Sequence, residues 1–243
     1  MTQPKLLIRP ADQRFHTQLD WLESWHSFSF AGHSDPAWMG FGPLRVINDD
    51  TIAAGRGFGM HPHNDMEIVT VMVEGELSHA DSMGHSAVLR AGEVQRMSAG
   101  TGIVHSEINR SDRSCRLLQI GIEPERIGID PAYEQQPFSI GADWTPLIDP
   151  AGTGGALATE SASRMWRARP RPQQSLALPE MPNTDLWIQV IHGELELRLD
   201  DGSNHRLNRG DGAGLVNAAQ GHHSVVASDH DADILLLALP RHP

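Results

Sequence analysis

The sequence predicts an all-β protein built from two antiparallel β-barrels that pack together, with only short helical segments. Two observations carry this prediction. Short runs rich in β-branched and apolar residues alternate with Gly, Pro and Asp turns, and no run has the length and period of a long helix. In addition, part of the chain repeats at an offset of 118 residues: VEGEL at 73–77 returns as IHGEL at 191–195, and the turn at Gly92 returns at Gly210.

Length and composition set the number of structural units. A chain of 243 residues with 39% hydrophobic and 21% charged residues is typical of globular domains, and it is long enough for two. We therefore assign residues 1–135 to the first barrel and residues 136–243 to the second.

Charge and cysteine content restrict the partners and the compartment. The formal net charge of −12 offers no basic surface to a phosphate backbone or an anionic membrane, so we expect no direct nucleic-acid binding and no membrane binding. Cys115 is the only cysteine, which rules out an intrachain disulfide and favours a reducing compartment. The first residues lack the pattern of a secretion signal, and no run approaches the ~18 apolar residues of a membrane span. The predicted location is cytoplasmic.

The elements of the first barrel follow in order. A short strand is predicted at 5–9, closed by Pro10, and the mixed pattern at 19–25 is expected to include a turn of helix. Glycines and prolines cut the segment 28–47 into short strands and loops, whose aromatic residues belong in the core or at a pocket rim. Further strands are predicted over 68–73, 76–80, 86–89 and 115–120.

A segment rich in Pro, Gly and Ala joins the two barrels at 124–172. Within it, the residues AGTGG at 151–155 are too flexible for a central strand and predict a loop. The stretch 164–171 holds four arginines around Trp166. We expect a solvated strand whose arginines pair with the excess carboxylates, and an anion or partner site is the alternative.

The strongest chemical signal lies in residues 57–109, where histidines recur at strand spacing. Side chains two residues apart on a strand share a face, so His61 lies beside His63, and His105 lies beside Glu107. If these strands oppose each other inside the barrel, three imidazoles and a carboxylate converge, which is a ligand set for a first-row transition metal. A closed structural zinc site would need four ligands and typically thiolates, so we expect open positions for a substrate or dioxygen.

The second barrel lacks this ligand set. Carried forward by the offset of 118, the four ligand positions fall on Pro179, Met181, His223 and Val225. Only one of them keeps a histidine, and a single histidine does not hold a transition metal tightly. We therefore predict that the second barrel is structural and has no metal.

Two segments resemble the cupin motifs in the form that the pirin family carries. The first is GMHPHNDME at 59–67, and the second is GEVQRMSAGTGIVHSEIN at 92–109. Upstream, SWHSFSFA at 24–31 and MGFGPLRVINDD at 39–50 resemble the same family. The match is dense from about residue 20 to residue 135 and weaker beyond it.

The resemblance implies a bicupin fold of jelly-roll type, with one divalent metal in the first barrel. The implied ligands are His61, His63, His105 and Glu107. Glu67 stands at about the spacing at which related cupins place a carboxylate ligand, and strand parity turns it the same way as His61 and His63. We assign Glu107 as the ligand and Glu67 to a supporting or acid/base role. Fe(II) is the expected metal, with Mn, Ni, Co, Cu and Zn as alternatives.

Two functions are compatible with such a site. Because some pirins are quercetin dioxygenases, the resemblance implies an oxidoreductase that uses O2 to cleave a flavonol, with Glu107 and Glu67 as its catalytic residues. A barrel mouth lined by Met60, Met66 and the N-terminal aromatic residues would suit such a flat polyphenol. The alternative is a non-catalytic, metal-dependent binding or regulatory module that acts through a protein partner. Turnover of a flavonol distinguishes the two functions.

Overall fold

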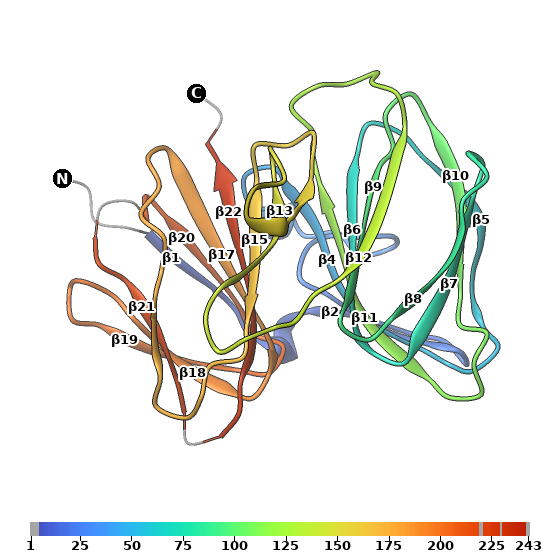
Figure 1. Ribbon diagram of the computed structural model, residues 1–243. Helices are drawn as coiled ribbons and strands as arrows, with labels where there is room; N and C mark the ends of the chain where they lie inside the picture. Colours follow the sequence, from blue (N-terminus) through green and yellow to red (C-terminus); the bar gives the residue numbers. More distant parts are fainter. Residues whose placement is uncertain (1–4, 219–220, 229, 242–243) are drawn as a thin grey trace.

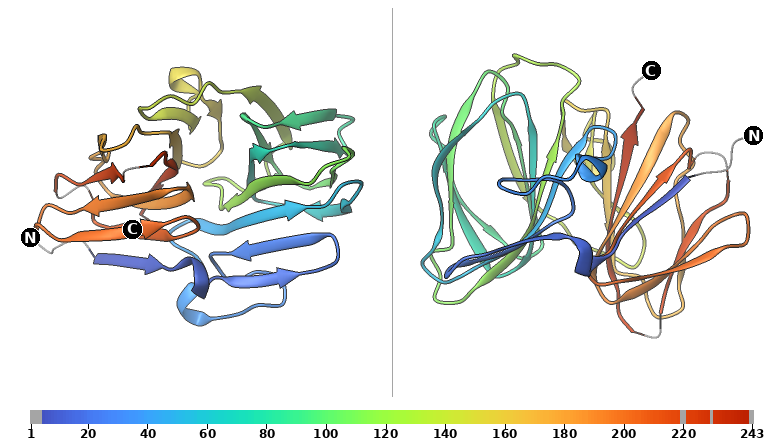
Figure 2. Two further views of the ribbon diagram at one scale, coloured as in Figure 1. Left: turned by 90° about the horizontal axis from the view of Figure 1, so that it is seen from below. Right: turned by 180° about the vertical axis from the view of Figure 1, so that it is seen from behind.

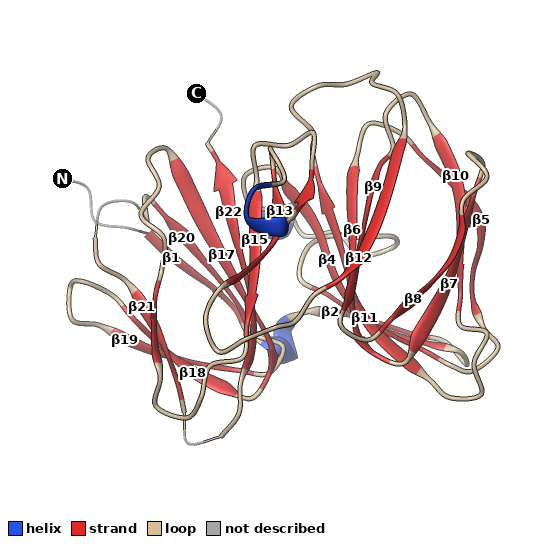
Figure 3. Ribbon diagram, viewed as in Figure 1, coloured by secondary structure: helices blue, strands red, loops and turns tan. Residues whose placement is uncertain are grey.

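The computed structural model describes residues 5–218, 221–228 and 230–241, which form two barrels lying side by side (Figure 1). Each barrel consists of two facing sheets, one of seven strands and one of four, which are not hydrogen-bonded into a closed cylinder within the described ranges. Figure 3 shows how little helix the fold contains. The helical pieces are three short 3-10 turns: η1 (Ala11–Gln13), η2 (Pro36–Trp38) and η3 (Thr153–Gly155). The all-β prediction is confirmed.

The first barrel pairs a seven-stranded sheet of order β12-β9-β6-β11-β4-β3-β2 with a four-stranded sheet of order β5-β10-β7-β8. The strands of the large sheet are β2 (Phe15–Gln18), β3 (Leu22–His26), β4 (Leu44–Ile52), β6 (Glu67–Glu74), β9 (Glu93–Ser98), β11 (Cys115–Ile122) and β12 (Ala132–Pro137). Those of the small sheet are β5 (Gly57–His63), β7 (Glu76–Asp81), β8 (Ser86–Arg90) and β10 (Ile103–Ile108).

The second barrel repeats this arrangement, with sheets of order β1-β20-β17-β22-β15-β13-β14 and β16-β21-β18-β19. The strands of its large sheet are β1 (Lys5–Arg9), β13 (Thr145–Asp149), β14 (Leu157–Ala158), β15 (Arg164–Ala168), β17 (Thr184–His192), β20 (Gly212–Val216) and β22 (Asp233–Pro240). Those of its small sheet are β16 (Ser175–Ala177), β18 (Glu194–Arg198), β19 (Asn204–Asn208) and β21 (Ser224–Ala227).

The first and last strands of the segment 1–135, which the sequence assigned to the first barrel, do not follow that assignment fully. Strand β1 pairs with β20, Lys5 opposite Val216, so the start of the chain belongs to the second barrel; Figure 2 shows it beside the strands of that barrel. Strand β12 pairs with β9 of the first barrel and continues past residue 135 to Pro137. The turn of helix expected at 19–25 is wrong, because Leu22–His26 pairs with β4 as a strand.

The internal repeat is confirmed by the backbone conformation of its glycines. Gly75 and Gly193 have φ of 74° and 76°, and Gly92 and Gly210 have φ of 88° and 87°. A side chain is strained in this left-handed region, so the same turns require glycine in both barrels. At Gly75 a Cβ would also lie 2.9 Å from the Cβ of Cys115.

The large sheets of the two barrels pack face to face around a shared hydrophobic core. Trp187 of the second barrel is fully buried there, with its ring centroid 4.9 Å from that of Phe28 and 5.4 Å from that of Phe41. Val69 and Val71 of β6 face the same core. Successive side chains alternate across a sheet, so Ile68 and Thr70 face the interior of the first barrel. The barrels thus form one packed body.

Three of the four arginines in 164–171 pair with carboxylates, as predicted, but the strand is not solvated, because β15 lies between β22 and β13 and Arg167 is buried. Arg164 donates to Asp149 at 2.9 Å, while Arg167 makes two hydrogen bonds to Asp233 at 2.7 and 2.6 Å. Arg169 shares the Asp233 carboxylate at 2.9 Å.

Among the residues that the structure describes, no helix has the length and apolar character needed to cross a membrane.

Candidate metal centre

Three histidines converge at the small sheet of the first barrel. His61 on β5 is the direct cross-strand partner of His105 on β10, and their ring centroids lie 4.4 Å apart. The ring of His63 lies 4.9 Å from each of the other two. One nitrogen from each ring lies within 4.8 Å of the others. The convergence of the three imidazoles expected from strand parity is thus present, but Glu107 is not part of this group.

A glycine turn sets the position of His105. Gly100 has a φ of 46°, and a Cβ there would lie 2.1 Å from the carbonyl oxygen of Ile129. The amide of Thr101 donates to that same oxygen at 2.8 Å, which ties the turn to the loop before β12. Beyond it, the register between β10 and β5 shifts after His105, where one β10 residue lies opposite Gly59 and Met60, so the extra residue of this bulge is on β5. Such a bulge re-aims side chains within a strand.

Burial lowers the pKa of His63 and His105, which keeps these two rings neutral and available as ligands. Desolvation, followed by the neighbouring rings of His61 and His63, lowers the pKa of His105 to about 3. Neither of its ring nitrogens has a hydrogen-bond partner among the residues described. In His61, Nδ1 lies 2.8 Å from the carbonyl oxygen of Gly59 and must donate to it, which leaves Nε2 free. Buried polar atoms without partners are rare, and a bound divalent metal would satisfy these.

Glu107 lies beside His105, where its ligand atom is within 4.8 Å of those of His79 and His105, whereas His61 and His63 group with His105 without it. The side chain of Glu107 is buried, and its Oε1 accepts from the hydroxyl of Thr70 at 3.3 Å and the amide of Gln95 at 3.5 Å. Burial raises the pKa of Glu107 to about 7, and the charge of Asp50 acts in the same direction. A nearby cation would favour the ionised form, so this carboxyl group fits a metal ligand.

Glu67 is not brought to the histidines. It lies on the face of β6 opposite Ile68 and Thr70, and its Oε2 accepts from Ser98 at 3.0 Å and from Thr159 at 2.8 Å. The parity argument that linked it to the histidines does not hold, because 64–66 between β5 and β6 is not strand and breaks the alternation. Thr70 and Gln95 take the supporting place that we predicted for Glu67.

A second group of residues beside His105 was not found from the sequence. His79 on β7 offers a ligand atom within 4.8 Å of those of His105 and Glu107. Its Nε2 lies 3.0 Å from the carboxylate of Asp81, whose Oδ2 also lies 2.9 Å from Nδ1 of His85. Tyr133 stacks on His79. The H-x-D spacing on a predicted strand was the signal that could have revealed this group.

Two of the three histidines open onto a cavity of about 390 Å3 between the two sheets of the first barrel. Glu107 lines this cavity together with His61 and His63. Its walls are mostly apolar, from Leu22, Phe30, Ile52, Phe58, Met66, Ile68 and Leu117. Met66 and Phe30 therefore lie where we expected them, whereas Met60 is 59% exposed and is not part of the lining.

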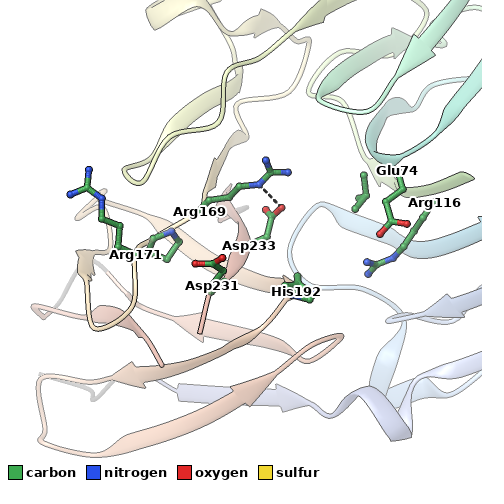
Figure 4. Close-up of a pocket in the computed structure, with 10 residues that line it drawn as sticks. Glu74, Arg116, Arg169, Arg171, His192, Asp231 and Asp233 are labelled. Carbon is green, nitrogen blue, oxygen red and sulfur yellow. Dashed lines mark hydrogen bonds and ion pairs between the residues drawn. The ribbon is translucent and has the colours of Figure 1, made fainter. Parts of the chain in front are cut away.

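A second cavity, of about 510 Å3, lies between the two barrels (Figure 4). Its charged residues are of both signs, and several already pair: Arg116 with Asp49 at 2.8 Å and Arg169 with Asp233 at 2.9 Å. No group of metal ligands lines it among the residues described. This cleft does not have the chemistry of the histidine site.

The interior of the second barrel is filled by apolar side chains. Met181 packs against a core that includes Leu178 and Val225, so two of the four offset positions contribute hydrophobic contacts. His223 is buried, and its Nδ1 accepts from the amide of Asp200 at 3.4 Å. The described part of this barrel contains no cluster of three ligand side chains.

Two repeated two-sheet barrels, with an H-x-H strand and an H-x-E strand meeting in one of them, define a protein of the cupin class with two cupin domains. Residues 9–122 match the pirin family, and residues 147–239 match the quercetinase C-terminal cupin domain. The chain belongs to the pirin family.

The similarity to known members spans nearly the whole chain. The chain is 39% identical to the quercetin 2,3-dioxygenase of Escherichia coli (strain K12), over 97% of this chain and 99% of the relative. A crystal structure of YhhW from Escherichia coli matches with a TM-score of 0.91 at 40% identity, covering 98% of this chain and 99% of that one. The nickel(II) complex of this bacterial pirin matches with a TM-score of 0.90 at 39% identity, covering 98% and 100%.

Proposed function

We propose that this protein is a cytoplasmic, metal-dependent oxidoreductase of the quercetin 2,3-dioxygenase type, which cleaves the heterocyclic ring of a flavonol with O2. The observation that carries the proposal is a cluster of three imidazoles, two of which, His61 and His63, open with the buried carboxylate of Glu107 onto a mostly apolar cavity. A cavity of about 390 Å3 is of the size that binds small organic ligands. The similarity to a relative named quercetin 2,3-dioxygenase supports the choice of substrate.

His61, His63, His105 and Glu107 would hold one divalent metal, for which Fe(II) is our choice. The nickel(II) complex of YhhW supports a divalent metal in this family. When bound, the metal supplies a Lewis acid that lowers the pKa of a chelating hydroxyl group and a centre for dioxygen chemistry. Thr70 and Gln95 orient Glu107, which is placed to hold the proton that the substrate hydroxyl releases. The apolar walls exclude water and bind the flat rings.

The test is to incubate iron-loaded protein with quercetin and O2 and to measure flavonol loss, O2 uptake and carbon monoxide release together. We expect all three to proceed in parallel, and Glu107→Gln to lower both metal content and turnover. The control is the His61→Ala/His63→Ala variant with the same total iron, because free metal also oxidises flavonols. Flavonol loss at the control rate, or without carbon monoxide, would refute the dioxygenase and leave the metal-dependent binding module.

A further inference from the structure

A cluster of four buried polar side chains lies in the wall that faces the metal centre, and this wall also contains Thr17 and Gln119. Ser24 and His26 on β3, with Asn48 and Asp50 on β4, line the cavity from the large sheet, whereas the metal-binding histidines lie on the small sheet. All four are at least 96% buried, with exposures of 1% to 4%. Buried polar groups are costly in such a wall unless they are paired or have a function.

Most of the hydrogen-bonding capacity of these residues is used within the cluster. Nδ1 of His26 donates to Oδ1 of Asn48 at 2.8 Å, and its Nε2 accepts from the hydroxyl of Thr17 at 2.9 Å. The hydroxyl of Ser24 donates to Oδ1 of Asp50. These bonds fix the orientation of Asp50 before any ligand arrives.

One acceptor remains free. Oδ2 of Asp50 has no hydrogen-bond partner among the residues that the structure describes, and the side chain lines the cavity. No Lys or Arg lines this cavity, so the free oxygen has no cation to pair with inside it. A ligand that carries a hydrogen-bond donor on an apolar, flat body would satisfy both the carboxylate and the walls. A phenolic hydroxyl group is such a donor.

We infer that Ser24 and Asp50, supported by His26 and Asn48, form a hydroxyl-binding subsite that selects polyhydroxylated flavonols. The inference rests on the proposed function, because the chelating end of the flavonol must lie at the histidines for a second hydroxylated ring to reach the opposite wall. The subsite determines specificity and takes no part in the oxygen chemistry.

The test compares two ligands on metal-loaded protein without O2, so that binding is measured without turnover. Quercetin carries hydroxyl groups on its outer rings, whereas 3-hydroxyflavone keeps only the chelating hydroxyl and carbonyl. We expect the wild type to bind quercetin at least about tenfold more tightly, since a site built for a hydroxyl group rejects the analogue that lacks it. Asp50→Ala should remove most of this preference by weakening quercetin binding, with 3-hydroxyflavone affinity unchanged within about twofold.

Two further variants keep the result interpretable. Ser24→Ala removes the orienting hydrogen bond and should reduce the preference in part, which keeps the test available if Asp50→Ala does not fold. Thr51→Ala, next to Asp50 but on the other face of β4, should leave both affinities unchanged. The subsite would be overturned if Asp50→Ala weakened the binding of quercetin and 3-hydroxyflavone equally. It would also be overturned if the wild type showed no preference for quercetin. Absence of turnover with the binding preference intact would refute the dioxygenase and not the subsite.

Discussion

Asp81 lies outside the proposed ligand set but orients His79, which offers a ligand atom within 4.8 Å of those of His105 and Glu107. Oδ2 of Asp81 faces Nε2 of His79 at 3.0 Å, so His79 donates there and keeps Nδ1 as an unprotonated nitrogen beside His105. Asn at this position would retain an acceptor for the amides of Met83 and His85 that now bond to Oδ1. It would, however, present an N–H to His79 and favour the opposite tautomer.

We therefore expect Asp81→Asn to lower metal affinity about 10- to 100-fold while the fold is kept. Competition with a chelating dye gives the affinity, and circular dichroism reports the fold. Asp201→Asn, at an exposed turn of the second barrel, is the matched control and should bind metal as the wild type does. Unchanged affinity in Asp81→Asn would show that the tautomer of His79 has no influence on the site.

Asp50 also predicts a pH dependence for the metal-free protein. Burial raises its pKa to about 7 in the folded state, whereas the unfolded chain releases this proton near pH 4. The stabilisation that the folded state gains by binding this proton more tightly is therefore full below about pH 4, and it is lost as the pH rises through about 7. Asp50→Asn, which has no charge to bury, should gain stability relative to the wild type over that window, by at most on the order of 4 kcal/mol.

Urea unfolding of chelator-treated protein at several pH values measures this difference. We expect the gap between the variant and the wild type to widen from about pH 4 to about pH 7 and then to level off. Glu107 titrates in the same range, so Glu107→Gln should show a similar trend and serves as a comparison. A gap that does not change with pH would contradict the raised pKa of the buried Asp50 carboxyl group.

Residue spacing predicted that His61, His63 and His105 would meet, because His61 and His63 lie within one strand that pairs with the strand of His105, and it placed Glu107 beside His105. Spacing gave the wrong orientation for Glu67. Alternation of side chains holds only within an unbroken strand, and Asp65, which lies between His63 and Glu67, adopts a φ of 47°. His79 and Asp50 could not be ranked from the sequence either. Their importance depends on which strands face each other, and this is decided by long-range pairing.

At the scale of elements, the turn before β10 is the most sensitive part of the site. Gly100→Ala would place a Cβ 2.1 Å from the backbone oxygen of Ile129, in a left-handed conformation that already disfavours alanine by about 1 kcal/mol or more. We expect a lower melting temperature and weaker metal binding, because relief of the clash must move the start of β10 and with it His105.

Gly59→Ala on β5 is the matched control for this variant. A Cβ there meets nothing within 4 Å, and the residue is not among the glycines with positive φ. Its stability should remain within about 0.5 kcal/mol of the wild type. Thermal unfolding and metal titration of both variants provide the measurement. Gly100→Ala with unchanged stability and affinity would show that the turn does not position His105.

Local patterns identified most strands but not their partners. The repeat at an offset of 118 predicted two copies of one barrel, and the matched glycine conformations confirm it. The pairing of β1 with β20 could not be predicted, since a strand of five residues carries no signal for a partner some two hundred residues away. The same limit explains why Leu22–His26 was not predicted as a strand: its conformation depends on hydrogen bonds to β4.

For the whole molecule, the decisive feature is the core shared by the two large sheets. Trp187 and Leu237 of the second barrel pack in the same cluster as Phe28 and Leu118 of the first. Arg116 adds a buried link, since it bonds to Asp49 in its own barrel and to the carbonyl oxygen of Ile191 in the other. Unfolding of one barrel would expose this core, so each barrel depends on the other for its stability.

Metal binding in the first barrel should therefore stabilise the second. A ligand present at a thousandfold excess over its Kd stabilises the folded state by about 4 kcal/mol, and a cooperative unit shares this gain. We expect one calorimetric transition that moves upward as a whole on metal addition, and slower amide exchange in β17 and β22 as well as in β10. The His61→Ala/His63→Ala variant should fold but show neither change. Two separate transitions, of which only one responds to metal, would mean that the barrels unfold independently despite their common core.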